Sequence, residues 1–393
     1  MFWVFLKLGL TSFGGPVAHL GYFREAFVRR RCWLSDAQYS ELVALCQILP
    51  GPASSQVGMG IGMSQAGYPG LLAAWLGFTL PSALMLILAA YGLAQVESVW
   101  LDGVIAGLKL VAVVVVAQAL LGMYRSLVSG TRRLLIMFTA AGSMLLLGAV
   151  WSQLLVILLA GLAGRLWLGQ QTKTAPHTPL TFRGVSSVHG YIWLAMLVLL
   201  LAGLPVLGMI YSDAAWRLMD GLVRAGALVF GGGHVVLPLL QNEVVATGLV
   251  QESQFLAGYG LAQAVPGPLF TLASYLGAAF ADPAAGLPVA LGFGLLATLA
   301  IFLPAFLLFV GVLPFWQQLQ QRPGMHAALA GINAAVVGLL LAAWWNPVII
   351  SAVQGMADIG LLVVLAGLVW RGCPVWLLVL AGAAGGALLT LLA

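Results

Sequence analysis

Long apolar stretches recur along the whole chain of 393 residues, separated by short polar connections. Most are close to the length of about 20 residues that an α-helix needs to cross roughly 30 Å of hydrocarbon. None shows the alternating pattern of a membrane-spanning β-strand, so we expect helices. The predicted spans are residues 68–93, 101–124, 134–150, 151–168, 191–210, 287–313, 327–345, 348–370 and 374–392.

Four further apolar segments are broken in the middle by glycine or proline, and their motifs form two matched pairs. Residues 13–16 (FGGP) return as 230–233 (FGGG), and residues 47–52 (QILPGP) return as 263–268 (QAVPGP). Each arm of a broken segment has about 12 to 14 residues, or about 18–21 Å of helix. Because that length suits half a bilayer, a segment either crosses as a broken helix or turns back as a re-entrant hairpin.

The distribution of basic residues favours the hairpins. If the broken segments cross, the basic residues outside apolar runs lie on both sides of the membrane. If the segments turn back, Arg24, Arg29, Arg30 and Arg31 join the others and only Arg217 remains opposite. The positive-inside rule prefers the second arrangement.

The number of crossings predicts how the two halves are oriented. With hairpins, the first repeat crosses four times, and residues 191–210 add a fifth crossing before the second repeat begins. The second repeat therefore starts on the opposite side. Such an inverted-topology repeat, with broken helices meeting at the midplane, is typical of secondary transporters.

Composition agrees with a membrane location and excludes other classes. The chain is 62% hydrophobic and 7% charged, with a mean hydropathy of +1.05. The fold class is therefore an all-α polytopic membrane protein. The net charge of +5 does not indicate nucleic-acid binding, because the cations lie in short loops. Cys32, Cys46 and Cys373 are far apart, and we expect no metal, cofactor, disulfide or cleaved signal peptide.

A polar segment at residues 169–190 divides the chain. We expect a first transporter repeat at residues 1–168 and a second, inverted repeat at residues 216–393. Residues 169–215 then form the polar linker and a connecting transmembrane helix.

The breaks are the predicted ligand site. A half-helix that begins at a break carries unpaired N–H groups and the positive end of the helix dipole. The N–H groups of Ser54, Ser55 and Gln56 in the first half, and of Phe270 and Thr271 in the second, are expected to point inward. Such N-termini bind phosphate and sulfate in soluble proteins, so we expect a small tetrahedral dianion, although a simple kink is the alternative. The expected contacts are Phe13, Gly14, Gly15, Gln47, Pro50, Gly51, Pro52, Ser54, Ser55, Gly231, Gly232, Gly233, Gln263, Pro266, Gly267, Pro268 and Thr271.

Lys7 and Arg224 stand at matching positions, six residues before Phe13 and Phe230. A cation within a membrane segment usually marks a site or an ion path, so we expect both to balance the charge of the anion. The alternative is a long side chain that snorkels to the nearer interface.

Other polar residues are candidates for substrate contact or coupling. Gln47 and Gln263 each precede their break, and as buried amides they could bind an oxyanion or a freed carbonyl. Glu41 has no acidic counterpart and is a candidate proton carrier. Lys109 is matched by Asn333 in the second half, as expected for an asymmetric lining position.

At these motifs the chain resembles the chromate ion transporter family in its long, two-domain form. The motifs that carry the resemblance are residues 5–16 (FLKLGLTSFGGP), 49–52 (LPGP), 78–81 (FTLP), 230–241 (FGGGHVVLPLLQ), 266–268 (PGP) and 302–304 (FLP). The resemblance implies a bacterial inner-membrane protein that exports chromate, with sulfate as the competing oxyanion and an ion gradient as the driving force. Family members often have Asn where this chain has Ala53.

We therefore predict a secondary active transporter that exports chromate by alternating access and is not an enzyme. The alternatives are a sulfate or other oxyanion importer or exchanger, a passive channel, and a membrane enzyme acting on phosphorylated lipid. The enzyme would need a general base or acidic metal ligands, and only Glu41 is available. The expected partners are the anion, protons as coupling ion and the bilayer. The oligomeric state stays open, with a homodimer among the arrangements.

Overall fold

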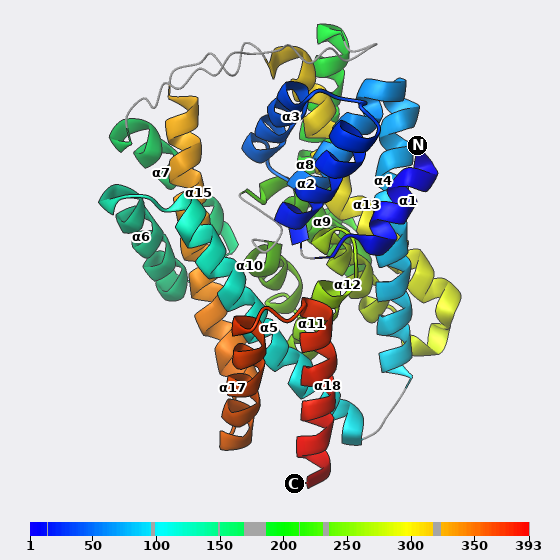
Figure 1. The fold of residues 1–393 in the computed structure, drawn as a ribbon, viewed down its shortest axis with the longest axis vertical. Helices are drawn as coiled ribbons and strands as arrows, with labels where there is room; N and C mark the ends of the chain where they lie inside the picture. Colours follow the sequence, from blue (N-terminus) through cyan, green and yellow to red (C-terminus); the bar gives the residue numbers. More distant parts are fainter. Residues whose placement is uncertain are drawn as a thin grey trace.

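The computed structural model describes residues 1–13, 15–95, 99–147, 150–168, 186–211, 213–230, 236–316 and 324–392. Within these ranges all regular structure is helical, and no strand occurs (Figure 1). Among the same residues, five helices are long and apolar enough to cross a membrane: Ala53–Ala94, Asp102–Arg125, Ser187–Ile210, Leu287–Phe315 and Ala327–Ala352. The prediction of an all-α, multi-pass membrane protein is therefore confirmed.

The first half of the chain and the connecting helix contain α1 (Phe2–Thr11), α2 (Gly15–Phe23), η1 (Arg24–Arg30), α3 (Asp36–Ile48), α4 (Ala53–Ala94), α5 (Val99–Leu127), α6 (Thr131–Leu147), α7 (Val150–Trp167) and α8 (Ser187–Ile210). The second half contains α9 (Ala214–Leu228), α10 (Val236–Leu240), η3 (Gln241–Val245), α11 (Glu252–Ala264), η4 (Leu269–Thr271), α12 (Leu272–Phe280), η5 (Pro283–Ala285), α13 (Leu287–Val312), η6 (Leu313–Phe315), α15 (Met325–Ala343), η7 (Trp344–Ile349), α16 (Ile350–Ala352), α17 (Met356–Trp370) and α18 (Val375–Leu392). Most of the predicted polar linker, residues 169–185, lies outside the described residues.

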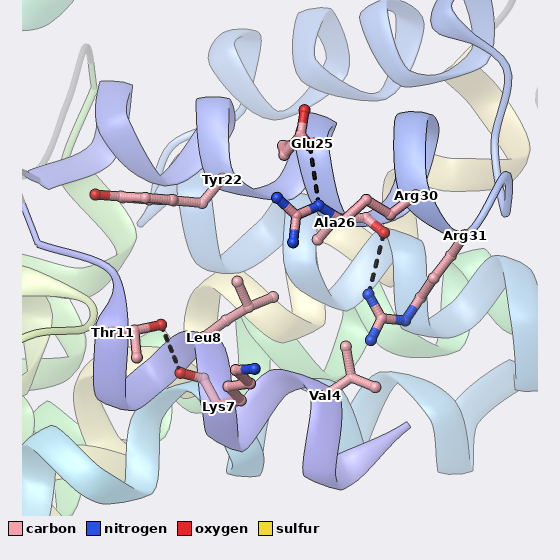
Figure 2. Close-up of a pocket in the computed structure, with 9 residues that line it drawn as sticks. All are labelled: Val4, Lys7, Leu8, Thr11, Tyr22, Glu25, Ala26, Arg30 and Arg31. Carbon is pink, nitrogen blue, oxygen red and sulfur yellow. Dashed lines mark hydrogen bonds and ion pairs between the residues drawn. The ribbon is translucent and has the colours of Figure 1, made fainter.

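The first broken segment forms a helical hairpin. Figure 2 shows Thr11 of α1 opposite Tyr22 of α2 near the break, and Val4 opposite Arg31 at the other end. The two arms, α1 and the continuous α2–η1 helix, therefore run antiparallel, with the break at the tip.

The long α4 is also a hairpin and not one straight rod. Ala66 and Gly67 have non-helical backbone angles, with φ of +61° at Gly67. A Cβ atom added at Gly62 would lie 2.8 Å from the Cβ atom of Ala74, although twelve residues of straight helix would span about 18 Å. The helix therefore folds back at Gly67, which agrees with the prediction that a separate helix begins at residue 68. In the second half α12 and α13 fold together in the same way, with Gly277 close to Ala297.

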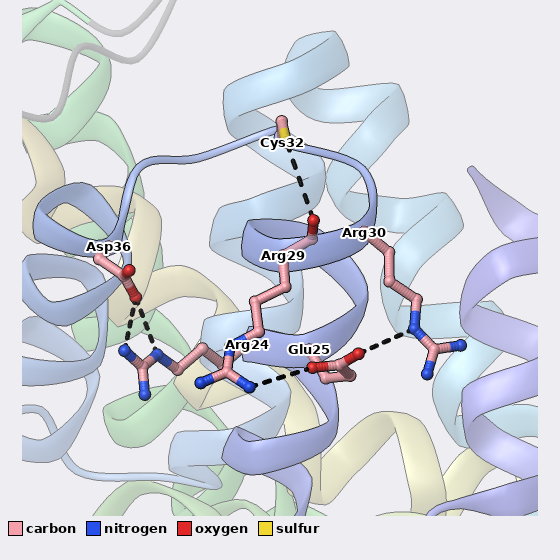
Figure 3. A network of polar contacts seen from close by, with 6 residues as sticks. All are labelled: Arg24, Glu25, Arg29, Arg30, Cys32 and Asp36. Atoms are coloured by element: carbon pink, nitrogen blue, oxygen red, sulfur yellow. Dashed lines mark hydrogen bonds and ion pairs between the residues drawn. The ribbon is translucent and has the colours of Figure 1, made fainter.

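A small polar network ties the first hairpin to the next helix. α3 begins with a capping box in which Ser35 and Gln38 exchange side-chain and backbone hydrogen bonds. Arg24 of η1 pairs with Asp36 in the first turn of α3 at 2.8 Å (Figure 3). Because both side chains are exposed, this ion pair contributes little to the stability of the fold. It holds the end of the first hairpin against the start of α3.

The two halves interlock through glycine-lined helix crossings. α5 of the first half packs on α18 of the second, with Gly107 against Gly382 and Gly386. α15 of the second half packs on α7 of the first, with Gly331 against Gly164. A Cβ atom at any of these glycines would meet backbone atoms of the facing helix, so only glycine permits this approach.

Candidate functional site

The two Pro-Gly-Pro breaks have the same backbone geometry. Leu49 is the C-cap of α3 and Val265 is the C-cap of α11, and both of these residues are extended. The central glycines then adopt φ of +117° at Gly51 and +111° at Gly267, a conformation that L-residues with side chains rarely adopt. Each break thus turns the chain sharply between an arriving helix and a departing one.

Each Pro-Gly-Pro break is hydrogen-bonded to the other half of the chain. The N–H of Gly51 donates to the carbonyl of Val229 at 2.7 Å, and the N–H of Gly267 donates to the carbonyl of Ser12 at 3.0 Å. Ser12 and Val229 occupy equivalent places, each directly before the Phe-Gly-Gly motif of its half. The Pro-Gly-Pro break of each half is therefore hydrogen-bonded to the residue before the Phe-Gly-Gly break of the other half.

The same glycines rest against a proline-containing helix of the opposite half. A Cβ atom at Gly51 would lie 2.7 Å from the Cβ of Ala305, which follows Pro304 in α13. A Cβ atom at Gly267 would lie 2.8 Å from Oγ of Ser82, which follows Pro81 in α4. Both breaks therefore require glycine for packing as well as for conformation.

The N-terminus of α4 presents unpaired donors inside the protein. Pro52 is the N-cap and provides no side-chain cap, and the first intrahelical bond runs from the N–H of Gln56 to its carbonyl. No described group accepts a hydrogen bond from the N–H of Ala53, Ser54 or Ser55. The side chains of Ser54 and Ser55 are buried, and within the described residues Oγ of Ser55 has no partner. An anion is the natural partner for such a cluster.

A histidine that the sequence did not place here lies beside these serines. His19 of α2 is buried, with Nδ1 at 3.4 Å from Oγ of Ser54 and Nε2 at 3.2 Å from the carbonyl of Ser12. Its ring also packs edge-on against Phe78 of α4. His19 therefore links the first Phe-Gly-Gly break to the start of α4. The residue at the matching position of the second half is Val236, so comparison of the two halves gave no signal for this contact.

The corresponding helix start in the second half has fewer free donors. Among the described residues no group accepts a hydrogen bond from the N–H of Leu269 or Phe270, as expected for Phe270, but Thr271 is bound. The hydroxyl of Thr271 donates to the carbonyl of Pro268 at 2.7 Å, and the N–H of Thr271 donates to the same oxygen at 3.0 Å. The helix begins there with the short η4 turn. The expectation that Gln56 and Thr271 offer free N–H groups is therefore wrong, because both already have backbone partners.

The predicted glutamines behave differently from each other. Gln47 is exposed at the end of α3, so the expectation of a buried amide there is wrong. The carbonyl of Pro50 that the break frees is instead bound by Nε2 of Gln56 at 2.9 Å. Gln263 is half-buried and hydrogen-bonded to Tyr259 one turn earlier. Gln56 is therefore the amide that binds the carbonyl freed by the first Pro-Gly-Pro break.

Part of the predicted site lies outside the described residues, namely Gly14, Gly231, Gly232 and Gly233. Phe13 is exposed, and Gly15 begins α2 with φ of +75°. Pro266 is buried, like Pro52 and Pro268.

Comparison with known proteins assigns the chain to a family. A model of the chromate transporter family matches residues 1–165 and 216–387. The chain belongs to the chromate transporter family. The chromate transport protein of Pseudomonas aeruginosa is 27% identical over 361 residues, which cover 86% of this chain and 77% of that protein. The chromate transport protein of Cupriavidus metallidurans is 26% identical over 364 residues, covering 90% and 82%. No solved structure matches the chain.

In this chromate transporter the two matched cations have different surroundings. Arg224 of α9 forms ion pairs with Asp220 at 3.0 Å and with Glu243 of η3 at 2.6 Å. The cluster contains two acidic groups and one basic group, and the carboxyl groups are almost completely buried. The spacing of Asp220 and Arg224, four residues apart, was the sequence signal for this pair. Lys7, by contrast, is exposed and lines a cavity between the arms of the first hairpin.

The candidate coupling residues are dispersed over three helices of the transporter. Glu41 of α3 is half-buried, and one of its carboxylate oxygens is buried without a partner among the described residues. Lys109 of α5 and Asn333 of α15 are half-buried. Neither forms a hydrogen bond or ion pair with another described residue.

Proposed function

We propose that this protein is a secondary active transporter that exports chromate across the bacterial inner membrane by alternating access. Membership of the chromate transporter family and the names of the two bacterial relatives support chromate as the substrate. The observation that carries the mechanism is the reciprocal bonding of the two Pro-Gly-Pro breaks beside a buried helix N-terminus with free donors.

The anion binds at the start of α4. The N–H groups of Ala53, Ser54 and Ser55, together with the two serine hydroxyls, provide hydrogen-bond donors for the oxygens of a tetrahedral dianion. A hydrogen bond to a charged group contributes about 1.5–3 kcal/mol, so two or three of them give useful affinity without permanent trapping. The positive end of the α4 dipole adds a smaller contribution.

Alternating access follows from relative motion of the two halves. In this proposal the halves are inverted repeats, each with re-entrant hairpins, and the binding site lies between them. Rocking of one half against the other breaks the bonds from Gly51 to Val229 and from Gly267 to Ser12 in turn. The breaks then act as the gates on either side of the anion.

Charge balance and coupling involve the nearby ionisable groups. Lys7 contributes positive potential from the hairpin of α1 and α2 without contacting the anion, whereas Arg224 is already paired with Asp220 and Glu243. Protonation of Glu243 or Glu41 changes the field at the site, which makes both candidates for the residue that exchanges protons. Lys109 and Asn333 are proposed to line the path asymmetrically.

Flux measurements in proteoliposomes test this function. We expect uptake of radiolabelled chromate, inhibited by sulfate, that responds to an imposed pH gradient. Flux that only dissipates the chromate gradient and ignores the pH gradient would indicate a channel. Movement of anion and protons in the same direction would favour the importer, because an inward proton gradient would then drive the anion inward.

A further inference from the structure

A cavity of about 520 Å³ lies along the first hairpin, between α1 and the continuous α2–η1 helix (Figure 2). We call it the hairpin cavity. Its volume falls within the range of about 300–1,000 Å³ that is usual for small-ligand sites. It is lined by Val4, Lys7, Leu8, Thr11, Tyr22, Glu25, Ala26, Arg30 and Arg31.

The charges on the wall of the hairpin cavity do not cancel. Glu25 is paired with Arg30 at 2.9 Å and with Arg29 at 3.6 Å (Figure 3). The hydrogen bond from Arg30, together with the charges of both arginines, lowers the pKa of Glu25, which therefore stays ionised and engaged. Arg31 donates a hydrogen bond to the carbonyl of Ala26 at 3.3 Å, and its guanidinium lies over the ring of Trp33 at 6.0 Å. No described carboxylate lies within ion-pair distance of Arg31 or Lys7. Two cations thus face the cavity without an anionic partner.

The second half of the chain shows what these cations lack. η1 and η3 begin at equivalent positions, so that Lys7 corresponds to Arg224, Trp3 to Asp220 and Ala26 to Glu243. In the second half, α9 packs against α10 and η3, and we call this pair of arms the second hairpin. There the carboxylate oxygens of Asp220 and Glu243 lie 3.0 and 2.6 Å from the guanidinium of Arg224. In the first hairpin the corresponding residues are tryptophan and alanine, and a cavity occupies the space.

We propose that the hairpin cavity binds a phosphate group, whose oxygens take the place that the carboxylates of Asp220 and Glu243 hold in the second hairpin. Lys7 and Arg31 provide the charge; both line the cavity, and Figure 2 shows the guanidinium of Arg31 in the space between the two arms and Lys7 on α1. The site is separate from the start of α4, and its ligand is not the transported anion.

The surface around the cavity favours a phospholipid headgroup as the source of this phosphate. Trp3 and Leu10 are 77% and 51% exposed and share one face of α1 with Lys7, since these positions are spaced by four and three residues. An apolar face with a cation in its middle and arginines at its end suits a lipid whose chains lie along α1. Free inorganic phosphate is the second source, and the experiment separates the two.

The test measures lipid binding by native mass spectrometry of the purified full-length protein, titrated with phosphatidylglycerol or phosphatidylcholine. We expect preference for phosphatidylglycerol, weakened about fivefold in Lys7→Gln and in Arg31→Gln, since each cation near an anionic lipid contributes on that order. Ala26→Glu introduces the carboxylate of the second hairpin and should abolish the preference. Arg29→Gln is the matched control on η1, outside the cavity, and should stay within about twofold of wild type.

The outcomes are distinct. If the cavity variants lose phosphatidylglycerol binding and inorganic phosphate does not displace the lipid from the wild-type protein, the ligand is the lipid headgroup. If inorganic phosphate displaces the lipid, the ligand is the free ion. Equal binding in all variants, or an equal loss in Arg29→Gln, overturns the proposal because binding would then reflect general surface charge. The readout does not depend on flux, so its failure leaves the proposed transport function standing.

Discussion

Replacing Gly51 with alanine tests whether the first Pro-Gly-Pro break is built as the structure indicates. The backbone at Gly51 has φ of +117°, where a residue with a side chain is strained by about 1–3 kcal/mol. The new Cβ atom would also lie 2.7 Å from the Cβ of Ala305. Overpacking of this kind costs a further 1–3 kcal/mol, roughly, so Gly51→Ala should lose about 2–6 kcal/mol in total.

Two companion variants separate these contributions. Gly67 has φ of +61° but nothing within 4 Å of an added Cβ atom, so Gly67→Ala should show the conformational cost alone. Ala305→Gly removes the atom that Gly51→Ala meets. The double variant should therefore recover about 1–3 kcal/mol beyond the sum of the single effects.

The assay follows thermal unfolding in detergent by the labelling of Cys46, which is fully buried in the folded protein. Chromate flux in proteoliposomes is measured on the same preparations. We expect Gly51→Ala to be the least stable variant and to lose transport, because the gate residue cannot keep its bond to Val229. Wild-type stability and flux in Gly51→Ala would refute the packing argument. So would a double variant whose loss of stability equals the sum of the two single losses.

Three further predictions concern the site and the topology. Ser55→Ala should raise the chromate concentration for half-maximal flux about tenfold with unchanged unfolding, since it removes one donor to a charged ligand; unchanged flux would remove Ser55 from the site. Arg224→Ala should destabilise the protein by about 3–5 kcal/mol, because it leaves Asp220 and Glu243 buried without a cation, and thermal unfolding would show this; wild-type stability would contradict the ion-pair reasoning. Cysteines placed at residues 29–31 should be labelled from the same side as the 169–190 linker, and labelling from the opposite side would mean that the first segment crosses.

The fold class and the breaks followed from sequence because their causes are local. Long apolar runs can only be helices in lipid, and a glycine between two prolines cannot continue a helix. The return of helix α4 at Gly67 was visible as the start of a separate apolar run. The sequence also indicated Ser54 and Ser55, since polar residues after a break fall in the first turn of the next helix.

Contacts between distant elements could not be predicted in the same way. His19 reaches Ser54 only because α2 and the start of α4 are brought together by the fold. Arg224 seemed to be a free counter-charge, and its partner Glu243 lies on the other arm of the second hairpin. The bonds from Thr271 to the carbonyl of Pro268 depend on where the break places that carbonyl, which side-chain chemistry alone does not reveal.

The packing of α5 in the first half on α18 in the second half has a consequence for how the protein is made. The glycine face of α5 meets its partner only when α18 has been synthesised, because Gly107 packs on Gly382 and Gly386. During insertion that face stays in contact with lipid or with a helper protein for most of translation. A chain that stops before α18 therefore leaves the glycine face of α5 without the helix that covers it.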